Sequence, residues 1–390
     1  MRKRILASVL CAAMVAASVL GCGSSAASTA TSTAASKAAS TAASTAASTA
    51  ASVAASKAAS TAASTAASTA ASTAAGDASK DPAVELIFTS VSVTGDSHTT
   101  AMSAFADKVK ELSGGSVTCK VYSDGTLFTA DNELDALLNG DADIAYLSFP
   151  TLATQSGLEW CSMIASGYFW SSYDHMTSVL NGDIGKNEIR KKIQDATNCV
   201  PLSSFYLGAR EVNTRTKAIN SYADMSGLLL RMPNSETWLH LGEALGANPT
   251  PISFSELYTA LQTGAVDGQE NPLPTDVSAK FYEVTKYIAM TDHVIDSIMP
   301  CINKDTWNGM TAAQQQAVTD AMEYARGVND DARIAEEAKD IQTLTDNGIT
   351  VTKPDKEEFK KNVQAYYTNH PEQTAQWDMD LYNEIQAAAK

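Results

Sequence analysis

The residues with the clearest chemistry are one arginine and a polar segment that follows it along the chain. Arg231 lies in the run 227–234, GLLLRMPN, at the end of an apolar stretch that predicts a strand. Its guanidinium offers a planar fork of donors that matches a carboxylate. Residues 264–272, GAVDGQENP, combine glycines, acids, amides and a proline, and they predict a turn that holds Asn271 in a fixed place. Together the two segments predict a site that grips a small organic anion.

The elements that position these residues alternate between strands and helices. Apolar and β-branched residues predict strands, and apolar positions three and four apart predict helices. This order is typical of an α/β protein with a mixed or parallel sheet. In the first lobe we expect strands at 84–93, 117–122 and 143–149, and helices at 99–112 and 132–138.

A second lobe is predicted to begin near Cys199. A strand at 295–302 is expected to cross back to the first lobe, and a long helix at 311–347 with two C-terminal helices is expected to brace both lobes. The other predicted elements are strands at 201–207 and 228–232 and helices at 236–245, 255–263, 359–367 and 377–389.

The N-terminus has the features of a secretion signal. Three basic residues at positions 2–4 precede an apolar stretch, 5–20, that is too short to span a bilayer comfortably. The sequence Val-Leu-Gly-Cys at 19–22 resembles a lipobox. We therefore expect residues 1–21 to be a lipoprotein signal peptide and Cys22 to be the lipidation site. The alternative is an ordinary cleaved signal with an incidental cysteine.

Residues 22–80 are predicted to be a tether that follows the lipidated cysteine. They repeat Ala, Ser and Thr with a period near four and contain no aromatic residue, so they cannot form a packed core. A coil of this length has a root-mean-square span of about 40 Å. Such a tether would hold a binding domain away from a membrane surface.

The remaining residues, 81–390, have a globular composition and suffice for two lobes of ordinary size. We expect one lobe at about 81–198 with a return segment near 300–330, and the other at about 199–299 plus the C-terminal helices. The net charge of −16, which becomes −19 without the three basic residues of the signal, argues against nucleic acid as a partner. A buried arginine acts locally, so an anionic ligand is still compatible with this charge.

The six cysteines do not indicate a metal site. Cys11 lies in the signal and Cys22 is the proposed lipid site. The other four are too widely spaced for a compact metal knuckle. Disulfides and small buried core residues are both compatible with their spacing. These four are Cys119, Cys161, Cys199 and Cys301.

Three segments in a fixed order resemble a known family. AINSYADMSGLLLRMPN at 218–234 is followed by LGANPTPISFSELY at 245–258 and ALQTGAVDGQENPL at 260–273. They resemble the solute-binding proteins of tripartite ATP-independent periplasmic (TRAP) transporters, which pass C4-dicarboxylates, sialic acid and sugar acids to a membrane permease. The resemblance runs from about Val84 to the C-terminus. It implies a two-lobed, periplasmic-binding-protein-like α/β fold with mixed sheets, crossing hinge strands and a long bracing helix.

The resemblance also implies roles for four residues. In the family, the arginine that matches Arg231 forms a salt bridge with the ligand carboxylate, and a second arginine matches Arg210 in Gly-Ala-Arg at 208–210. The asparagine that matches Asn271 hydrogen-bonds the same carboxylate. The aromatic residue that matches Phe254 packs on the body of the ligand.

Simple electrostatics adds an expectation for the neighbouring residues. Two arginines close together repel each other, so we expect them to need an anion between them. We expect Glu270 and Asp267 to stabilise the predicted turn rather than to touch the ligand. Trp238 is expected to pack in the core.

Departures from the family pattern concern the rest of the ligand pocket. Where the sialic-acid branch has an acid, this chain has Ser148, which we take as a further ligand contact. The family's Gly-Asp pair is Phe128-Thr129 here, and a usual proline is Gly167. The resemblance therefore implies a conserved carboxylate clamp, and a sugar acid or dicarboxylate fits better than sialic acid.

The sequence argues against an enzyme and against a bound cofactor. Its five histidines share no metal-ligand spacing, and no nucleophile elbow, phosphate loop or HExxH motif is present. We expect a monomeric, extracytoplasmic receptor, lipid-anchored to the cell membrane, whose partners are the organic acid and the TRAP permease subunits. The alternative is a receptor of the same fold that presents its ligand to a membrane sensor protein.

Overall fold

The computed structural model describes residues 77–389. The predicted signal, Cys22 and the tether up to residue 76 lie outside the described residues. The last tether residues form a short 3-10 helix, η1 (Ala78–Lys80), where the side chain of Asp77 accepts a hydrogen bond from the Ser79 amide at 3.0 Å. Among residues 77–389 no helix combines the length and apolar character needed to cross a membrane.

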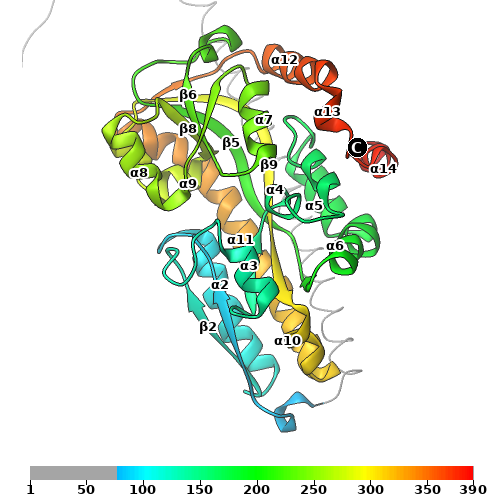
Figure 1. The fold of residues 1–390 in the computed structure, drawn as a ribbon. Coiled ribbons are helices and arrows are strands. Elements are labelled where there is room, and N and C mark those ends of the chain that lie inside the picture. Colours follow the sequence, from blue (N-terminus) through cyan, green and yellow to red (C-terminus); the bar gives the residue numbers. More distant parts are fainter. Residues whose placement is uncertain (1–76, 390) are drawn as a thin grey trace, which may run out of the picture. The chain divides into compact units, whose positions relative to one another are not determined.

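Within residues 77–389 the strands form one ten-stranded mixed sheet (Figure 1). Its order is β2-β1-β3-β9-β5-β8-β6-β7, and β4 and β10 also pair with β9. The strands are β1 (Val84–Thr89), β2 (Val117–Tyr122), β3 (Ile144–Leu147), β4 (Cys199–Pro201), β5 (Phe205–Thr214), β6 (Leu229–Met232), β7 (Asn248–Pro251), β8 (Gly268–Pro272), β9 (Tyr287–Asn303) and β10 (Thr350–Thr352).

Strand β9 belongs to both halves of this sheet. It has 17 residues, which is about 55 Å of extended chain. Its C-terminal end pairs with β3 from Met299 to Ile302, and the preceding part pairs with β5 from Tyr287 to Ile298. The predicted crossing strand is thus confirmed and is longer than expected. In Figure 1 β9, in yellow, runs from the level of β5 and β8 to α10.

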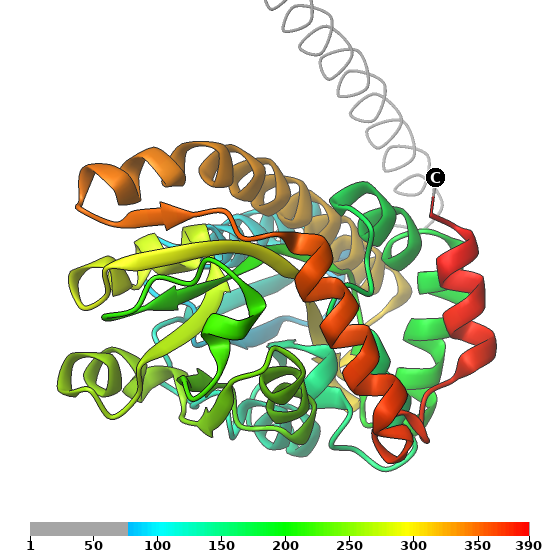
Figure 2. The ribbon, with the colours of Figure 1, turned by 90° about the horizontal axis from the view of Figure 1, so that it is seen from above.

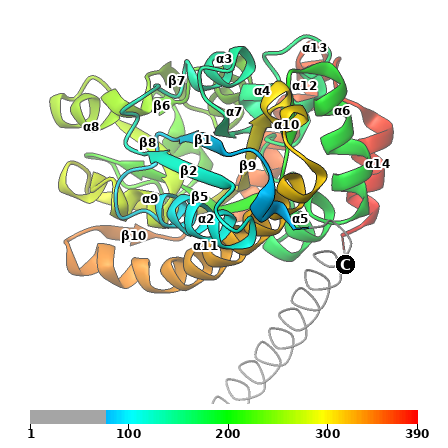
Figure 3. The same ribbon diagram turned by 90° about the horizontal axis from the view of Figure 1, so that it is seen from below.

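The helices cover the sheet, and α11 is the longest of those described. Its 35 residues span about 52 Å, and Thr311 and Gln314 cap it reciprocally. It packs against α2, β5 and α9. Figure 2 shows α11 along one side of the sheet, and Figure 3 shows α2 beside it.

The helices of the first part of the chain are α2 (Ser97–Leu112), α3 (Glu133–Asn139), α4 (Phe149–Leu152), η2 (Glu159–Met163), α5 (Tyr173–Leu180), η3 (Gly185–Ile189) and α6 (Arg190–Ala196). Those of the second part are η4 (Tyr222–Met225), α7 (Glu236–Ala244), α8 (Phe254–Thr263), α9 (Leu273–Ser278), η5 (Phe281–Glu283), α10 (Lys304–Gly309), α11 (Ala312–Asp346), α12 (Lys356–Asn369), α13 (Pro371–Thr374) and α14 (Met379–Ala387). The predicted strand at 117–122 and the long helix at 311–347 are confirmed.

The predicted turn at 264–272 is wrong in its second half. Gly264 does end α8 in a left-handed conformation with φ +81°. Gly268–Pro272, however, is strand β8, which lies between β5 and β6 and is buried at every position. Low β-propensity is overridden there because the polar side chains find buried partners on neighbouring elements. All four cysteines of the described region are free thiols, which excludes disulfides among them in this structure.

Candidate carboxylate-binding site

Arg231 is a buried cation whose two terminal guanidinium nitrogens have no partner among the described residues. It lies on β6 with 3% of its surface exposed, and its Nε donates to the carbonyl oxygen of Ile252 at 2.8 Å. No residue between 77 and 389 forms a hydrogen bond or ion pair with its two Nη atoms. Burial lowers the pKa of Arg231 to about 10, and the charges of Glu270, Arg210 and Asp131 modify this value. The guanidinium is therefore a desolvated group with unused donors.

Arg210, on β5, is neutralised inside the protein. Its Nε and Nη2 contact the two carboxylate oxygens of Glu270 at 2.5 and 2.6 Å, and its Nη1 contacts Asp296 at 2.9 Å. Its guanidinium carbon also lies 4.6 Å from the ring centre of Trp238, a buried residue of α7 that packs in the core as expected. Burial alone would lower the pKa of Arg210, but the two carboxylates raise it.

Two expectations about this region are therefore wrong. The arginine pair does not need an external anion to relieve its repulsion, because Glu270 and Asp296 already balance Arg210. Glu270 does not stabilise a turn: it is fully buried on β8 and contacts His293 Nε2 at 3.1 Å as well as Arg210. Burial alone would raise the pKa of Glu270, but Arg210 and His293 bring it down to about 2.

Asp296 and His293 form one cluster with Arg210 and Glu270, and their place in this cluster was not predicted from the sequence. Both lie on β9, while Arg210 and Glu270 lie on β5 and β8. One signal was available. Asp296 interrupts the apolar strand sequence VIDSIM at 294–299, and an acid within a buried strand requires a partner. The identity of that partner depends on strand order, which the sequence does not reveal.

Asn271 is held from two sides. Its Nδ2 donates to Gln269 Oε1 at 2.5 Å, and its Oδ1 accepts from Arg210 Nη2 at 3.2 Å. Gln269 is the residue opposite Arg231 in the parallel pair β6–β8. The fold therefore brings Arg231, Arg210 and Asn271 to three adjacent strands.

Phe254 and Ser148 differ in their relation to this cluster. Phe254 begins α8, two residues after the carbonyl that binds Arg231, and its half-buried ring packs edge-on against Phe281 at 5.8 Å. Ser148 caps α4 at the end of β3, where its Oγ accepts from the Thr151 amide at 3.2 Å. Among the described residues, Ser148 makes no hydrogen bond to the other four candidates. Their roles in ligand binding stay predictions.

Comparison with known proteins places the chain in a family. Residues 88–374 match the family described as bacterial extracellular solute-binding protein, family 7. The chain is 34% identical to the sialic acid-binding periplasmic protein SiaP of Vibrio cholerae over 262 residues, which cover 67% of this chain and 80% of that protein. It is 27% identical to the 2,3-diketo-L-gulonate-binding periplasmic protein YiaO of Escherichia coli over 256 residues, which cover 66% of this chain and 77% of that protein.

A solved structure of a similar protein has the same fold as this chain. A TRAP periplasmic solute-binding protein of Roseobacter denitrificans, with bound 3-deoxy-D-manno-oct-2-ulosonic acid, superposes with a TM-score of 0.74 at 34% identity. The match covers 78% of this chain and 99% of that one. The fold and the matched sequence define an extracytoplasmic solute receptor of two lobes, and not an enzyme. The chain belongs to solute-binding protein family 7, the solute-binding proteins of TRAP transporters.

Proposed function

We propose that this protein captures a sugar acid or a related small carboxylate and delivers it to a TRAP membrane permease. The observation that carries the proposal is the open fork of Arg231, a buried cation whose two Nη atoms have no partner among residues 77–389. A carboxylate accepts up to four hydrogen bonds, and a bidentate pair with arginine is strong and directional. Binding of such an anion would compensate a charge that the folded protein holds at a cost.

Four further residues complete the proposed binding site. Asn271 and Arg210 lie beside each other at 3.2 Å and would help to fix the carboxylate, with Arg210 acting mainly through its ordered neighbours. Phe254 would pack on the carbon chain of the ligand, and Ser148 would contact its far end from the other lobe. The relatives support the sugar-acid class, since solved family structures hold L-galactonate, β-D-galacturonate and D-erythronate.

We propose in addition that the protein is a lipoprotein that functions as a monomer. Signal cleavage before Cys22 and lipidation of that cysteine would anchor it to the outer face of the cell membrane. Residues 22–80 would then hold the binding domain away from the membrane surface. The lipobox-like sequence at 19–22 and the composition of the tether support this part of the proposal.

The test is a calorimetric titration with a panel of acids. The panel holds 3-deoxy-D-manno-oct-2-ulosonate, L-galactonate, D-galacturonate, 2,3-diketo-L-gulonate, N-acetylneuraminate and succinate. We expect at least one sugar acid to bind, and Arg231→Ala to weaken its binding by about 30- to 4,000-fold, since removing one member of a buried charge pair costs about 2–5 kcal/mol. Arg231→Lys should also lose affinity, because one ammonium cannot replace the planar fork.

Arg215→Ala is the matched control, because this arginine lies against Gly264 at the end of α8 and takes part in none of the hydrogen bonds described for Arg231, Arg210 and Asn271. It should bind like the wild type. An Arg231→Ala protein that stays folded and binds within threefold of the wild type would show that the carboxylate lies elsewhere.

A further inference from the structure

We propose that helix α9 couples the ligand-binding amide of Asn271 to helices α2 and α11, with Asp276 and Arg333 as positioning residues. The proposal rests on the proposed function of Asn271 and deepens it. Helix α9 begins directly after Pro272, so it is covalently continuous with the strand that carries Asn271. It also packs against α11 and β5. Both of its faces are bonded to other elements, which makes it a mechanical link between them.

The first face of α9 orients Asn271. Asp276 is fully buried, and its two carboxylate oxygens accept from Gln269 Nε2 at 2.7 Å and from Asn213 Nδ2 at 3.1 Å. Because Gln269 uses its Nε2 on Asp276, its Oε1 points to Asn271 and accepts from Nδ2 at 2.5 Å. Asp276 thereby determines which way the Gln269 amide faces. The Gln269 amide in turn determines which way the Asn271 amide faces.

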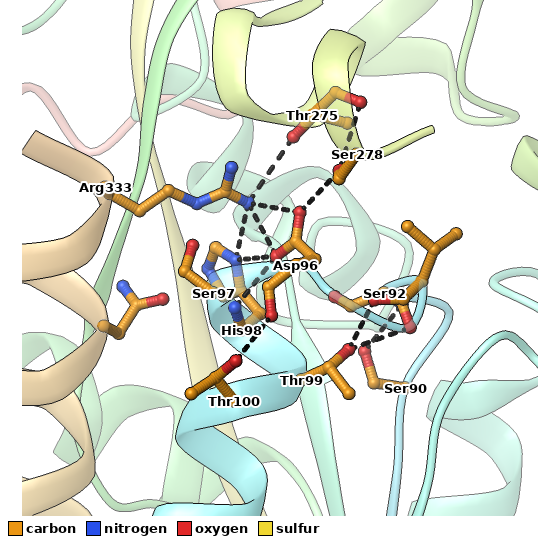
Figure 4. A network of polar contacts seen from close by, with 12 residues as sticks. Ser90, Ser92, Asp96, Ser97, His98, Thr99, Thr100, Thr275, Ser278 and Arg333 are labelled. Atoms are coloured by element: carbon orange, nitrogen blue, oxygen red, sulfur yellow. Dashed lines mark hydrogen bonds and ion pairs between the residues drawn. The ribbon is translucent and has the colours of Figure 1, made fainter. Parts of the chain in front are cut away.

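The second face of α9 contacts α2 and α11 (Figure 4). Ser278 Oγ donates to Asp96 Oδ2 at 2.9 Å, and Arg333 Nη2 reaches Thr275 Oγ1 at 3.5 Å. The same Nη2 donates to both oxygens of Asp96, at 3.0 and 3.2 Å. Asp96 also caps α2 by accepting from the His98 amide at 2.8 Å. Three helices from distant parts of the chain therefore meet at one carboxylate.

Charge and burial make this cluster sensitive to its geometry. Arg333 and Asp96 are 1% and 5% exposed, and His98 is fully buried. Arg333 Nη2 also contacts His98 Nδ1 at 2.7 Å, and the same Nδ1 lies 3.1 Å from Asp96 Oδ1. Only Nη2 of Arg333 makes these bonds, and its Nε and Nη1 have no partner among the described residues. A displacement of α9 relative to α2 and α11 would therefore disturb the bond from Ser278 to Asp96 and the contact of Thr275 with Arg333 Nη2.

The two faces belong to one short helix of six residues. A rotation or shift of α9 that follows a movement of α2 or α11 would therefore change the bonds of Asp276, and with them the orientation of Asn271. Conversely, a ligand that fixes Asn271 would fix α9 and the contacts of Arg333 and Asp96. Ligand capture and the relation of the two lobes are in this way linked through α9.

A double-mutant cycle tests the link, with 3-deoxy-D-manno-oct-2-ulosonate as the titrated probe. In Asp276→Asn, the new side-chain NH₂ group faces the amide nitrogen of either Asn213 or Gln269, which is also a donor. One of those two side-chain amides must therefore turn. Arg333→Met removes the convergent nitrogen, and Ser278→Ala is a milder variant that removes a single bond to Asp96. We expect Asp276→Asn and Arg333→Met each to weaken binding about 10-fold in the wild-type background, but less than about twofold in the Asn271→Ala background.

Arg333→Lys is the conservative variant, because one ammonium can replace the single nitrogen in use, and it should bind within about threefold of the wild type. Equal fold-changes of Asp276→Asn, Arg333→Met and Ser278→Ala in both backgrounds would overturn the proposal, since a merely structural role does not depend on Asn271.

A ligand-free measurement separates this proposal from the proposed function. In hydrogen exchange, Arg333→Met or Ser278→Ala should increase exchange in β8 and α9 as well as in the first turn of α2. Ser103→Ala, which removes only a bond to the Thr99 carbonyl on the surface of α2, is the control and should leave β8 unchanged. Increased exchange confined to α2 would refute the coupling. If exchange increases in β8 and α9 as expected but the protein binds none of the acids, the coupling stands and the proposed function is refuted.

Discussion

Replacement of Arg231 by methionine is expected to stabilise the ligand-free protein while it removes carboxylate binding. Burial lowers the pKa of Arg231 from its ordinary value to about 10. Each pKa unit corresponds to about 1.4 kcal/mol, so holding this charge in the folded protein costs about 3 kcal/mol. Because the folded-state pKa of this base is depressed, the cost is complete at neutral pH and is relieved only as the pH rises above about 10.

The methionine variant also loses an interaction. The hydrogen bond from Nε to the Ile252 carbonyl, at 2.8 Å, contributes about 1 kcal/mol. The expected net gain is therefore about 2 kcal/mol in the free energy of unfolding. For a folded domain of roughly 310 residues, with an unfolding entropy of about 2.1 cal/mol/K per residue, that corresponds to an increase in Tm of about 3 °C. Methionine retains an unbranched chain of similar volume, so the packing around β6 is preserved.

Arg210→Met provides the contrast. Arg210 is as deeply buried, but its removal leaves the carboxylates of Glu270 and Asp296 without their partner, which costs about 3–5 kcal/mol. Urea unfolding of both ligand-free variants at pH 7 measures the difference. The reasoning would be refuted by an Arg231→Met protein less stable than the wild type, or by an Arg210→Met protein as stable as the wild type.

Three other outcomes are expected. Acidification from pH 7 to pH 4 should destabilise the wild type more than His98→Asn, as measured by urea unfolding at each pH. Burial and Arg333 hold the pKa of His98 at about 4 in the folded protein, below its usual 6.5. The unfolded chain therefore takes up the proton first, and folding stability is lost as the pH falls from 6.5 to 4. The wild type should lose stability relative to Glu133→Gln as the pH rises from 4.5 to 8. Burial raises the pKa of Glu133 to about 8 in the folded protein, so this carboxyl group ionises first in the unfolded chain. A parallel pH dependence of the two proteins would contradict this prediction. Cys22→Ser should release the protein from the membrane fraction or block its processing, and equal retention of a correctly processed variant on immunoblots would exclude lipid anchoring at Cys22.

Much of the fold follows from local patterns. The strand at 117–122 and the helix at 99–112 have apolar periodicities that match one element type, and the helix at 311–347 is rich in Ala, Gln and Glu. All three were predicted to within two residues. Arg231 was also predicted at the end of a strand, and it lies there on β6. These features are local because they depend on backbone preference and on the spacing of apolar side chains within one segment.

Strand β8 shows where such patterns are insufficient. The sequence Gly-Gln-Glu-Asn-Pro has low strand propensity and consists of residues that usually form turns. It is a central strand because Gln269, Glu270 and Asn271 each find a buried partner on another segment. Since those partners lie up to about 60 residues away in sequence, no local pattern could assign β8 or its contacts.

The sequence by itself determined the class of the protein and the position of Arg231 at the end of a strand. Only the tertiary structure decided which charges meet. It joined Arg210 to Glu270 and Asp296, left the fork of Arg231 without a protein partner, and brought Arg333 to Asp96 across 237 residues of chain. The physical reason is that burial makes each charge dependent on its nearest neighbours, and strand order and helix packing choose those neighbours over long distances in sequence.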